Sequence, residues 1–351
     1  MKTLRTLSAR RLLGLSIMGG LAVCFLLPLG DFARMALAGE TKTNLSPPTA
    51  ATDMQPITME PISPVPLQVE LDQKKVELGR MLFNDSRLSS GNGLSCASCH
   101  VLQRALADGQ PISAGVAGDS MTTNTLTLFN VGLNQMLGWN GQTTSLEEQA
   151  EGVVKRRMGG DWNEIVSTLG ADSGMRAAFG EIYNDGLTRN NIISALVEYE
   201  KSLDTPNAPF DRYLRGDQNA LSADAKAGYQ LFKDYGCASC HQGVNVGGNM
   251  FQVFGIFGTP DAAENGALTE GSAQDTGIAD DRPVFRVPSL RNVQHTGPYF
   301  HDGSVSTLPE AIGIMAQYQL GRDISKEEIL KIQAFLDSLT GEYKGTPIGH
   351  Q

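Results

Sequence analysis

The sequence predicts an all-α protein, and three observations favour that class. Apolar residues recur at intervals of three and four, the alternation typical of strands is scarce, and one helix-containing unit occurs twice. Its 351 residues are enough for about two domains. The predicted amphipathic helices cover residues 76–83, 146–154, 163–183, 189–203, 223–232, 308–320 and 325–339.

The first 38 residues have the pattern of a signal peptide. Basic residues precede the apolar run LLGLSIMGGLAVCFLLPLG, and residues 36–38 read ALA, the small-x-small form that signal peptidase cuts. We therefore expect residues 1–38 to direct export to the periplasm. Two alternatives remain open at this point: a retained membrane anchor, because the apolar run approaches spanning length, or a lipid attached through Cys24.

Residues 39–69 are rich in proline, threonine and serine and predict an extended leader lying over the surface. Beyond it, residues 77–95 and 226–236 form the repeated unit, each ending just before the pentapeptide CASCH. The matched positions in the two copies are Gly79, Leu82 and Phe83 in the first and Gly228, Leu231 and Phe232 in the second.

This repeat predicts two copies of one domain. Pro206 and Pro209 interrupt the helical pattern between the copies, which is where a boundary is expected. We therefore predict an N-terminal domain over residues 70–205 and a C-terminal domain over residues 206–351.

The pentapeptide CASCH covers residues 96–100 and 237–241. In an exported chain, CxxCH is the attachment signal for c-type haem: the cysteines form thioethers and the histidine binds the iron. Cysteines of the two motifs could instead form a zinc site or two small disulfides, but both readings leave the repeated histidine unexplained. The residues assigned to two covalently bound haems are Cys96, Cys99 and His100 for the first and Cys237, Cys240 and His241 for the second.

Charge and histidine content limit the function further. The formal net charge of -10 argues against a nucleic-acid-binding function, because nucleic acids bind to clusters of lysine and arginine. Apart from the two motif histidines, the chain has only His295, His301 and His350, so few side chains could close the sixth position of each iron. An iron closed by a second strong ligand transfers electrons, whereas an open iron can bind peroxide.

Residues 286–315, RVPSLRNVQHTGPYFHDGSVSTLPEAIGIM, resemble the C-terminal signature of the bacterial di-haem cytochrome c peroxidases, a family that is similar to the di-haem enzymes maturing methylamine dehydrogenase. The resemblance extends to residues 82–89, LFNDSRLS, and 207–217, NAPFDRYLRGD. It implies two cytochrome-c-like haem domains, the N-terminal one peroxidatic and the C-terminal one transferring electrons.

The resemblance also implies roles for single residues. Met315 falls where the family has the distal ligand of the C-terminal haem, with Tyr318 as a weaker candidate. Trp139 matches the tryptophan that the family has between the haems, and His301 is expected near a haem propionate or the inter-haem network. The residues implied for calcium are the side chain of Asn124 and the backbone carbonyls of Thr296 and Pro298.

Departures from the family pattern concern the N-terminal haem. Gln149 matches the distal glutamine, but Arg157 stands where relatives carry the distal glutamate, and Val116 stands where many have a histidine. We therefore expect an open N-terminal iron, with Arg157 polarising peroxide. The acidic residues left as alternative bases are Glu147, Glu148 and Glu151.

Together these features predict a periplasmic peroxidase that reduces hydrogen peroxide with electrons from a small cytochrome c or cupredoxin, and the family resemblance implies a homodimer. Two alternatives stay open: a di-haem enzyme that oxidises tryptophan or tyrosine residues of a partner protein, and a non-catalytic electron carrier or peroxide sensor.

Overall fold

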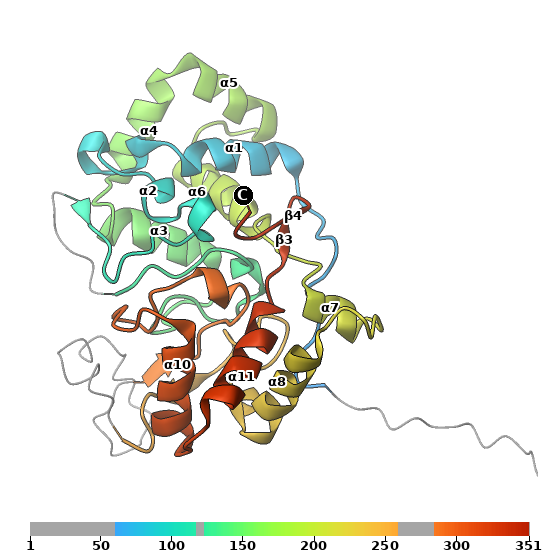
Figure 1. The fold of residues 1–351 in the computed structure, drawn as a ribbon. Coiled ribbons are helices and arrows are strands. Elements are labelled where there is room, and N and C mark those ends of the chain that lie inside the picture. The colour runs from blue at the N-terminus through green and yellow to red at the C-terminus, as the bar shows by residue number, and fades with distance from the viewer. Residues whose placement is uncertain (1–59, 117–122, 259–283, 351) are drawn as a thin grey trace, which may run out of the picture. The chain divides into compact units, whose positions relative to one another are not determined.

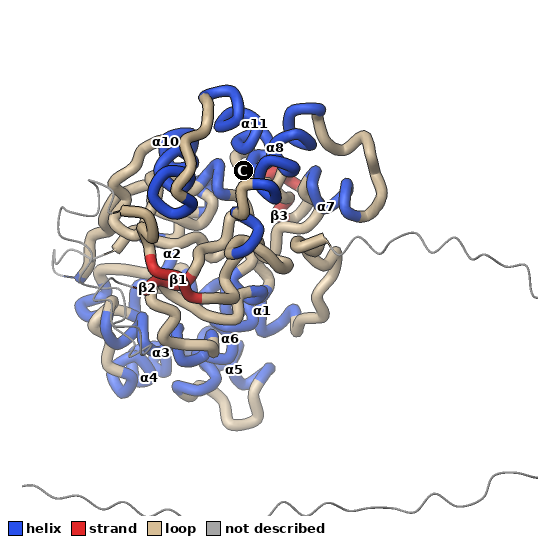
Figure 2. The backbone as a smooth tube through the Cα atoms, turned by 90° about the horizontal axis from the view of Figure 1, so that it is seen from below, coloured by secondary structure: helices blue, strands red, loops and turns tan. Residues whose placement is uncertain are grey.

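The structure, a computed structural model, describes residues 60–116, 123–258 and 284–350. These residues are rich in helix and contain few strands (Figure 1). The helices are α1 (Gln73–Phe83), α2 (Cys96–Cys99), α3 (Leu146–Arg156), α4 (Trp162–Ala171), α5 (Ser173–Ile182), α6 (Arg189–Lys201), α7 (Pro209–Leu214), α8 (Ala223–Asp234), α10 (Leu308–Ile314) and α11 (Lys326–Asp337). The strands form two antiparallel pairs, β1 (Phe251–Val253) with β2 (Val284–Arg286) and β3 (Glu342–Tyr343) with β4 (Thr346–Pro347) (Figure 2).

Within these ranges, no helix has both the length and the apolar character that crossing a membrane requires. The predicted signal peptide, residues 1–38, lies outside the described residues, and so does Cys24, the alternative site of lipid attachment.

Most of the helices begin at a serine, threonine or aspartate whose side chain accepts a hydrogen bond from the first turn. Asp172 accepts from the backbone N–H groups of Gly174 and Met175 at 2.8 and 3.2 Å. The same residue ends α4, so the segment predicted as one helix over residues 163–183 is two helices that meet at this cap.

Pro209, which the sequence indicated as an interruption, is the first residue of α7. Proline suits this position because the N–H it lacks would have no intrahelical partner. The next residue, Phe210, is fully buried, and its ring centroid lies 4.7 Å from that of Tyr229 and 5.0 Å from that of Phe335. The interruption thus starts a short helix that anchors the connection between the two repeated units.

A glycine lies at the crossing point of each main helix pair. In the crossing of α1 with α6, a Cβ added at Gly79 would lie 1.9 Å from the carbonyl oxygen of Ala195. In the crossing of α8 with α11, a Cβ added at Gly228 would lie 1.8 Å from the carbonyl oxygen of Lys331. The repeated glycine therefore permits the same close backbone approach in both copies.

Two hydrophobic clusters occupy the interior of the described residues. The first draws on α1 and α3 to α6, and the second on α7, α8, α10 and α11. Three residues belong to the cluster formed by the other half of the chain. Tyr343 and Ile348, near the C-terminus, belong to the first cluster, and Ile62 belongs to the second. Segments near both ends of the described chain thus pack on the other half, and the division into residues 70–205 and 206–351 stays a prediction.

The segment before α1, residues 60–65, packs into the protein instead of lying over its surface as expected. Ile62 and Val65 are 2 % and 0 % exposed. The Pro61 carbonyl accepts a hydrogen bond from the Gly243 N–H at 2.8 Å, and the Glu60 carboxylate accepts one from the Tyr229 hydroxyl. We call residues 60–65 the strap.

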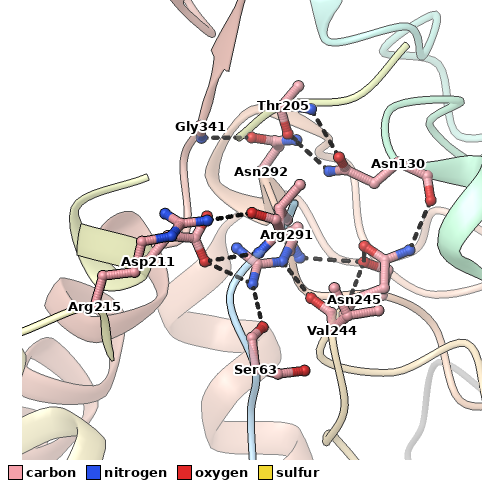
Figure 3. Close-up of polar contacts among 12 residues, drawn as sticks. Ser63, Asn130, Thr205, Asp211, Arg215, Val244, Asn245, Arg291, Asn292 and Gly341 are labelled. Carbon is pink, nitrogen blue, oxygen red and sulfur yellow. Dashed lines mark hydrogen bonds and ion pairs between the residues drawn. The ribbon is translucent and has the colours of Figure 1, made fainter. Parts of the chain in front are cut away.

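A buried ion pair holds the strap against the second cluster (Figure 3). Arg291 and Asp211 are both inaccessible to solvent, with 2.8 Å between guanidinium nitrogen and carboxylate oxygen. Arg291 also donates to the Ser63 carbonyl at 3.1 Å, and Asp211 accepts from the Val65 N–H at 3.3 Å. Because both charges are paired and hydrogen-bonded, their burial is tolerated.

Buried amides continue this network toward the first half of the chain (Figure 3). The Asn130 side chain donates to the Thr205 hydroxyl at 2.7 Å and accepts from the Thr205 N–H at 2.8 Å. The Asn292 side chain donates to the same hydroxyl at 2.9 Å, and its amide oxygen accepts from the Gly341 N–H at 3.0 Å. The connecting segment at residue 205 is therefore fixed from both sides.

Candidate functional site

The first CASCH motif forms α2 and the turn that follows it. His100 makes a hydrogen bond through Nδ1 to the Leu106 carbonyl at 2.9 Å, and the Phe83 ring lies 6.3 Å from its imidazole. Since a carbonyl only accepts, Nδ1 carries the proton and Nε2 keeps a lone pair. Burial lowers the pKa of His100, so the imidazole is neutral at pH 7 and able to bind a metal.

The second CASCH motif repeats this arrangement. His241 makes a hydrogen bond through Nδ1 to the Val246 carbonyl at 3.3 Å, and the Phe232 ring lies 6.4 Å away. Burial lowers the pKa of His241 to about 4, which keeps this imidazole neutral as well. Both motif histidines therefore present Nε2 as a ligand atom.

The four motif cysteines are free thiols in the structure. Burial raises the pKa of Cys96 to about 12 and that of Cys237 to about 11, so neither thiol is ionised at neutral pH. The described residues contain no cluster of three or more histidine, cysteine, aspartate or glutamate side chains able to hold a metal ion. The zinc site weighed from the sequence is thus not formed in the part of the chain that the structure describes.

A large cavity adjoins the second motif. It encloses about 1580 Å³ of space without protein atoms, part of which is open to solvent. Cys237, Cys240 and His241 line it together with Met315, and many of the remaining lining residues are aromatic or aliphatic. A largely apolar cavity with a thioether-forming pair, an imidazole and a methionine fits a covalently attached haem.

Met315 begins a π-helical turn, Met315–Gln319, directly after α10. Such turns are rare and shift side chains relative to a regular helix. Met315 is among the residues lining the cavity, whereas Tyr318, the weaker candidate, is not. The Tyr318 backbone carbonyl instead accepts a hydrogen bond from the Phe257 N–H at 2.8 Å.

The calcium and tryptophan candidates adjoin the same cavity. The cavity lining includes all five of these residues: Trp139, His301, Asn124, Thr296 and Pro298. The Trp139 indole N–H donates to the Asn124 backbone carbonyl at 2.8 Å, and the Asn124 N–H donates to the His301 backbone carbonyl at 2.7 Å. The Trp139 and His301 rings meet edge to face, with 6.3 Å between their centroids.

The Asn124 side chain has an amide oxygen that could bind a cation. Its amide nitrogen donates to the Gln110 carbonyl at 2.7 Å, which leaves the amide oxygen as the acceptor. Asn124 is 8 % exposed, so a cation bound at its amide oxygen would lie largely away from bulk water.

The distal candidates of the first haem lie on α3, away from this cavity. The Gln149 amide oxygen accepts from the Thr143 hydroxyl at 2.9 Å. Arg157 is the exposed C-terminal cap of α3. Val116, which stands where many relatives are expected to have a histidine, is half-buried. The structure therefore does not bring Gln149 and Arg157 into the cavity that holds His241 and Met315.

The alternative acidic bases differ in their surroundings. Glu151 forms an ion pair with Arg189, Glu148 is exposed, and a hydrogen bond from the Ser145 hydroxyl lowers the pKa of Glu147. Glu200, which the sequence did not single out, has its pKa raised to about 8 by burial and then by the Glu147 carboxylate. Glu200 therefore retains a proton at neutral pH.

Arg286 is a second residue that the sequence did not single out as functional. It lines the cavity, is 3 % exposed, and has a guanidinium nitrogen, Nη1, that meets no hydrogen-bond partner in the part of the chain that the structure describes. The only signal available in the sequence was its position at the start of residues 286–315, the segment that carries the resemblance.

Comparisons with known proteins show the family of this chain. The family model described as "Di-haem cytochrome c peroxidase" matches residues 73–219. "Cytochrome c peroxidase Ccp" of Escherichia coli is 41 % identical over 287 residues, covering 81 % of this chain and 62 % of that protein. "Cytochrome c551 peroxidase" of Nitrosomonas europaea is 39 % identical over 286 residues, covering 81 % of this chain and 85 % of that protein.

Solved structures give the same result for the fold. A MauG-like protein associated with microbial copper homeostasis matches with a TM-score of 0.64 and 28 % identity, covering 83 % of this chain and 96 % of that one. The di-haem peroxidase BthA of Burkholderia thailandensis matches with a TM-score of 0.62, covering 79 % of this chain and 88 % of that one. With 39 % identity over most of the Nitrosomonas relative's length, the chain belongs to the di-haem cytochrome c peroxidase family and is an oxidoreductase of that type.

Proposed function

We propose that this chain is a periplasmic di-haem c-type cytochrome that reduces hydrogen peroxide to water with single electrons from a small cytochrome c or cupredoxin. The observation that carries the proposal is the repeated CASCH motif with repeated surroundings. In both copies Nδ1 of the histidine meets a backbone carbonyl and a phenylalanine ring lies about 6 Å away, at 6.3 and 6.4 Å.

Two differently ligated haems suit this reaction. Reduction of one peroxide takes two electrons and two protons and yields two waters. Haem iron supplies the redox chemistry when bound. In the proposal Cys96, Cys99 and His100 hold the first haem with an open position for peroxide, and Gln149 and Arg157 bind and polarise peroxide there.

The second haem would pass electrons one at a time. Cys237 and Cys240 would attach it, and His241 and Met315 would both bind its iron, a ligand set that favours electron transfer over peroxide binding. Trp139, an oxidisable ring in the cavity wall, is proposed to carry charge toward the first haem, and His301 packs edge to face against it.

The finer architecture belongs to the same proposal. We infer an all-α fold of two cytochrome-c-like domains, residues 70–205 and 206–351, with calcium held by Asn124, Thr296 and Pro298. Export through residues 1–38 and assembly as a homodimer are proposed from the sequence.

Selective removal of each haem tests the proposal. The variant C237A/C240A should lose turnover with reduced cytochrome yet keep peroxide binding at the first haem, whereas the matched variant C96A/C99A should lose peroxide binding and keep a reducible second haem. Stopped-flow absorbance with peroxide, and with reduced cytochrome in turn, separates the two. Equal peroxide binding by both variants would overturn the assignment of roles.

Oxidation of a partner protein is a second candidate function. "Methylamine utilization protein MauG" of Methylophilus methylotrophus is 31 % identical over 294 residues, covering 79 % of this chain and 86 % of that protein. The related enzymes that mature methylamine dehydrogenase are expected to have a tyrosine ligand at the place of Met315, so the methionine that lines the cavity here argues against a tyrosine-ligated second haem. Rapid peroxide turnover with cytochrome alone would favour the peroxidase, and a covalently modified partner without such turnover would favour this candidate.

A further inference from the structure

Arg286 is a buried arginine in the wall of the cavity that adjoins the second motif. It is the last residue of β2 and pairs with Phe251 of β1. Its side chain is 3 % exposed, and burial lowers its pKa to about 10, so it remains a cation at neutral pH.

Two hydrogen bonds tie Arg286 to the Trp139 turn. Its backbone N–H donates to the Trp139 carbonyl at 2.9 Å, and Nε donates to the Gly138 carbonyl at 2.6 Å. Both bonds use only neutral acceptors, and Nη1 has no hydrogen-bond partner among the described residues. Arg286 therefore fixes the tryptophan turn while its charge stays uncompensated.

Arg291, the other fully enclosed arginine of this segment, provides the contrast. Its guanidinium lies 2.8 Å from the Asp211 carboxylate and also donates to the backbone carbonyls of Val244 and Ser63. Among the described residues no carboxylate lies within ion-pair distance of Arg286. Because a buried unpaired charge is costly, a cavity lined by one selects an anionic ligand.

We propose that Arg286 binds a carboxylate in this cavity, namely a propionate of the haem attached at Cys237 and Cys240, and that it thereby links this haem to the Trp139 turn. The inference rests on the proposed haem attachment and assigns the anion-binding residue of that site. A planar guanidinium with a free nitrogen is suited to a carboxylate, and the bond is strong where water is excluded.

The charge of Arg286 then affects the electron affinity of the second haem. A nearby cation favours the reduced iron, which carries one positive charge fewer, so its removal lowers the reduction potential. Because the charge of Arg286 interacts differently with the oxidised and the reduced iron, we expect its removal to shift the reduction equilibrium about tenfold, which is 59 mV for one electron.

The test is a spectroelectrochemical titration of the full two-haem protein and of three variants. R286Q removes the charge, whereas R286K keeps a charge but loses the Nε bond to Gly138. R176Q removes an equal charge from an exposed position on α5. We expect R286Q to lower the second haem's potential by about 59 mV or more, R286K to lower it less, and R176Q to leave it unchanged.

Each outcome has a distinct meaning. Equal potentials in R286Q and the parent protein, with haem content intact, would overturn the inference. Equal losses in R286K and R286Q would assign the effect to the Gly138 hydrogen bond and also overturn it. Loss of the second haem in R286Q alone, with R286K loaded, would support propionate binding. A parent protein without covalent haem would contradict the proposed function itself.

Discussion

The indole nitrogen of Trp139 donates a hydrogen bond to the backbone carbonyl of Asn124, with 2.8 Å between the two atoms. Asn124 in turn donates its own N–H to the His301 carbonyl at 2.7 Å. The proposed calcium ligand and the proposed electron-carrying ring are therefore part of one hydrogen-bonded unit, and a change at one should be felt at the other.

We expect Asn124→Ala to weaken calcium binding at least about tenfold, because it removes the side-chain ligand and loosens the shell around it. Isothermal titration calorimetry with calcium alone measures the affinity. Asn140→Ala, in the same loop as Trp139, is the control and should bind calcium as the parent protein does. Equal affinities for Asn124→Ala and the parent would contradict the calcium assignment.

The crossing glycines predict a paired loss of stability. Gly79→Ala and Gly228→Ala would each put a methyl group within 2 Å of a backbone oxygen, at 1.9 and 1.8 Å, so the helices must separate. We expect each to lower the free energy of unfolding by about 3 kcal/mol or more in denaturant titrations. Gly180→Ala on α5, where a Cβ meets nothing within 4 Å, should raise it by roughly 0.5–1 kcal/mol. Similar effects at all three positions would contradict the close crossings.

The buried ion pair between Asp211 and Arg291 predicts that the free energy of unfolding depends strongly on both residues. Asp211→Asn leaves the Arg291 charge enclosed without compensation and should cost about 3–5 kcal/mol of stability, while Asp211→Leu combined with Arg291→Met should recover much of that loss. Glu77→Gln, which breaks the exposed Arg80–Glu77 pair, should cost less than about 1 kcal/mol in the same denaturant titration. A double variant as unstable as Asp211→Asn would contradict this explanation.

Glu200 predicts a pH dependence of stability. Burial, followed by the Glu147 carboxylate, raises its pKa from the ordinary value of 4.5 to about 8, so the folded protein holds a proton that the unfolded chain releases. Its contribution to stability is therefore fully present below about pH 4.5 and is lost as the pH rises toward 8. Urea unfolding between pH 5 and 8 should show a steeper loss for the parent protein than for Glu200→Gln. Parallel losses of stability in the two proteins would indicate that Glu200 has its ordinary pKa in the folded protein and would contradict this prediction.

Much of the site could be predicted because its chemistry is local in the sequence. The CASCH motifs place two cysteines and a histidine within five residues, and the matched glycine and phenylalanine of each unit precede them on one helix. Apolar periodicity located most helices in the same way. The break at Asp172 was missed because an aspartate inside an apolar period also fits the exposed face of a continuous helix.

What the sequence could not predict depends on contacts between distant segments. The strap has no periodicity of its own, and Ile62 and Val65 are buried only because a surface more than 140 residues away receives them. Periodicity likewise does not distinguish Arg291, which has a buried carboxylate partner, from Arg286, which has none among the described residues. Both arginines lie in one recognisable segment, and only the fold separates their roles.

The most direct test of the account is to record optical and electron paramagnetic resonance spectra of the fully oxidised two-haem protein and then add one equivalent of hydrogen peroxide without prior reduction. We predict one high-spin signal from the His100 haem beside one low-spin signal from the His241 and Met315 haem, with prompt consumption of peroxide. Two low-spin haems that leave peroxide unchanged would contradict an open first haem and favour an electron carrier.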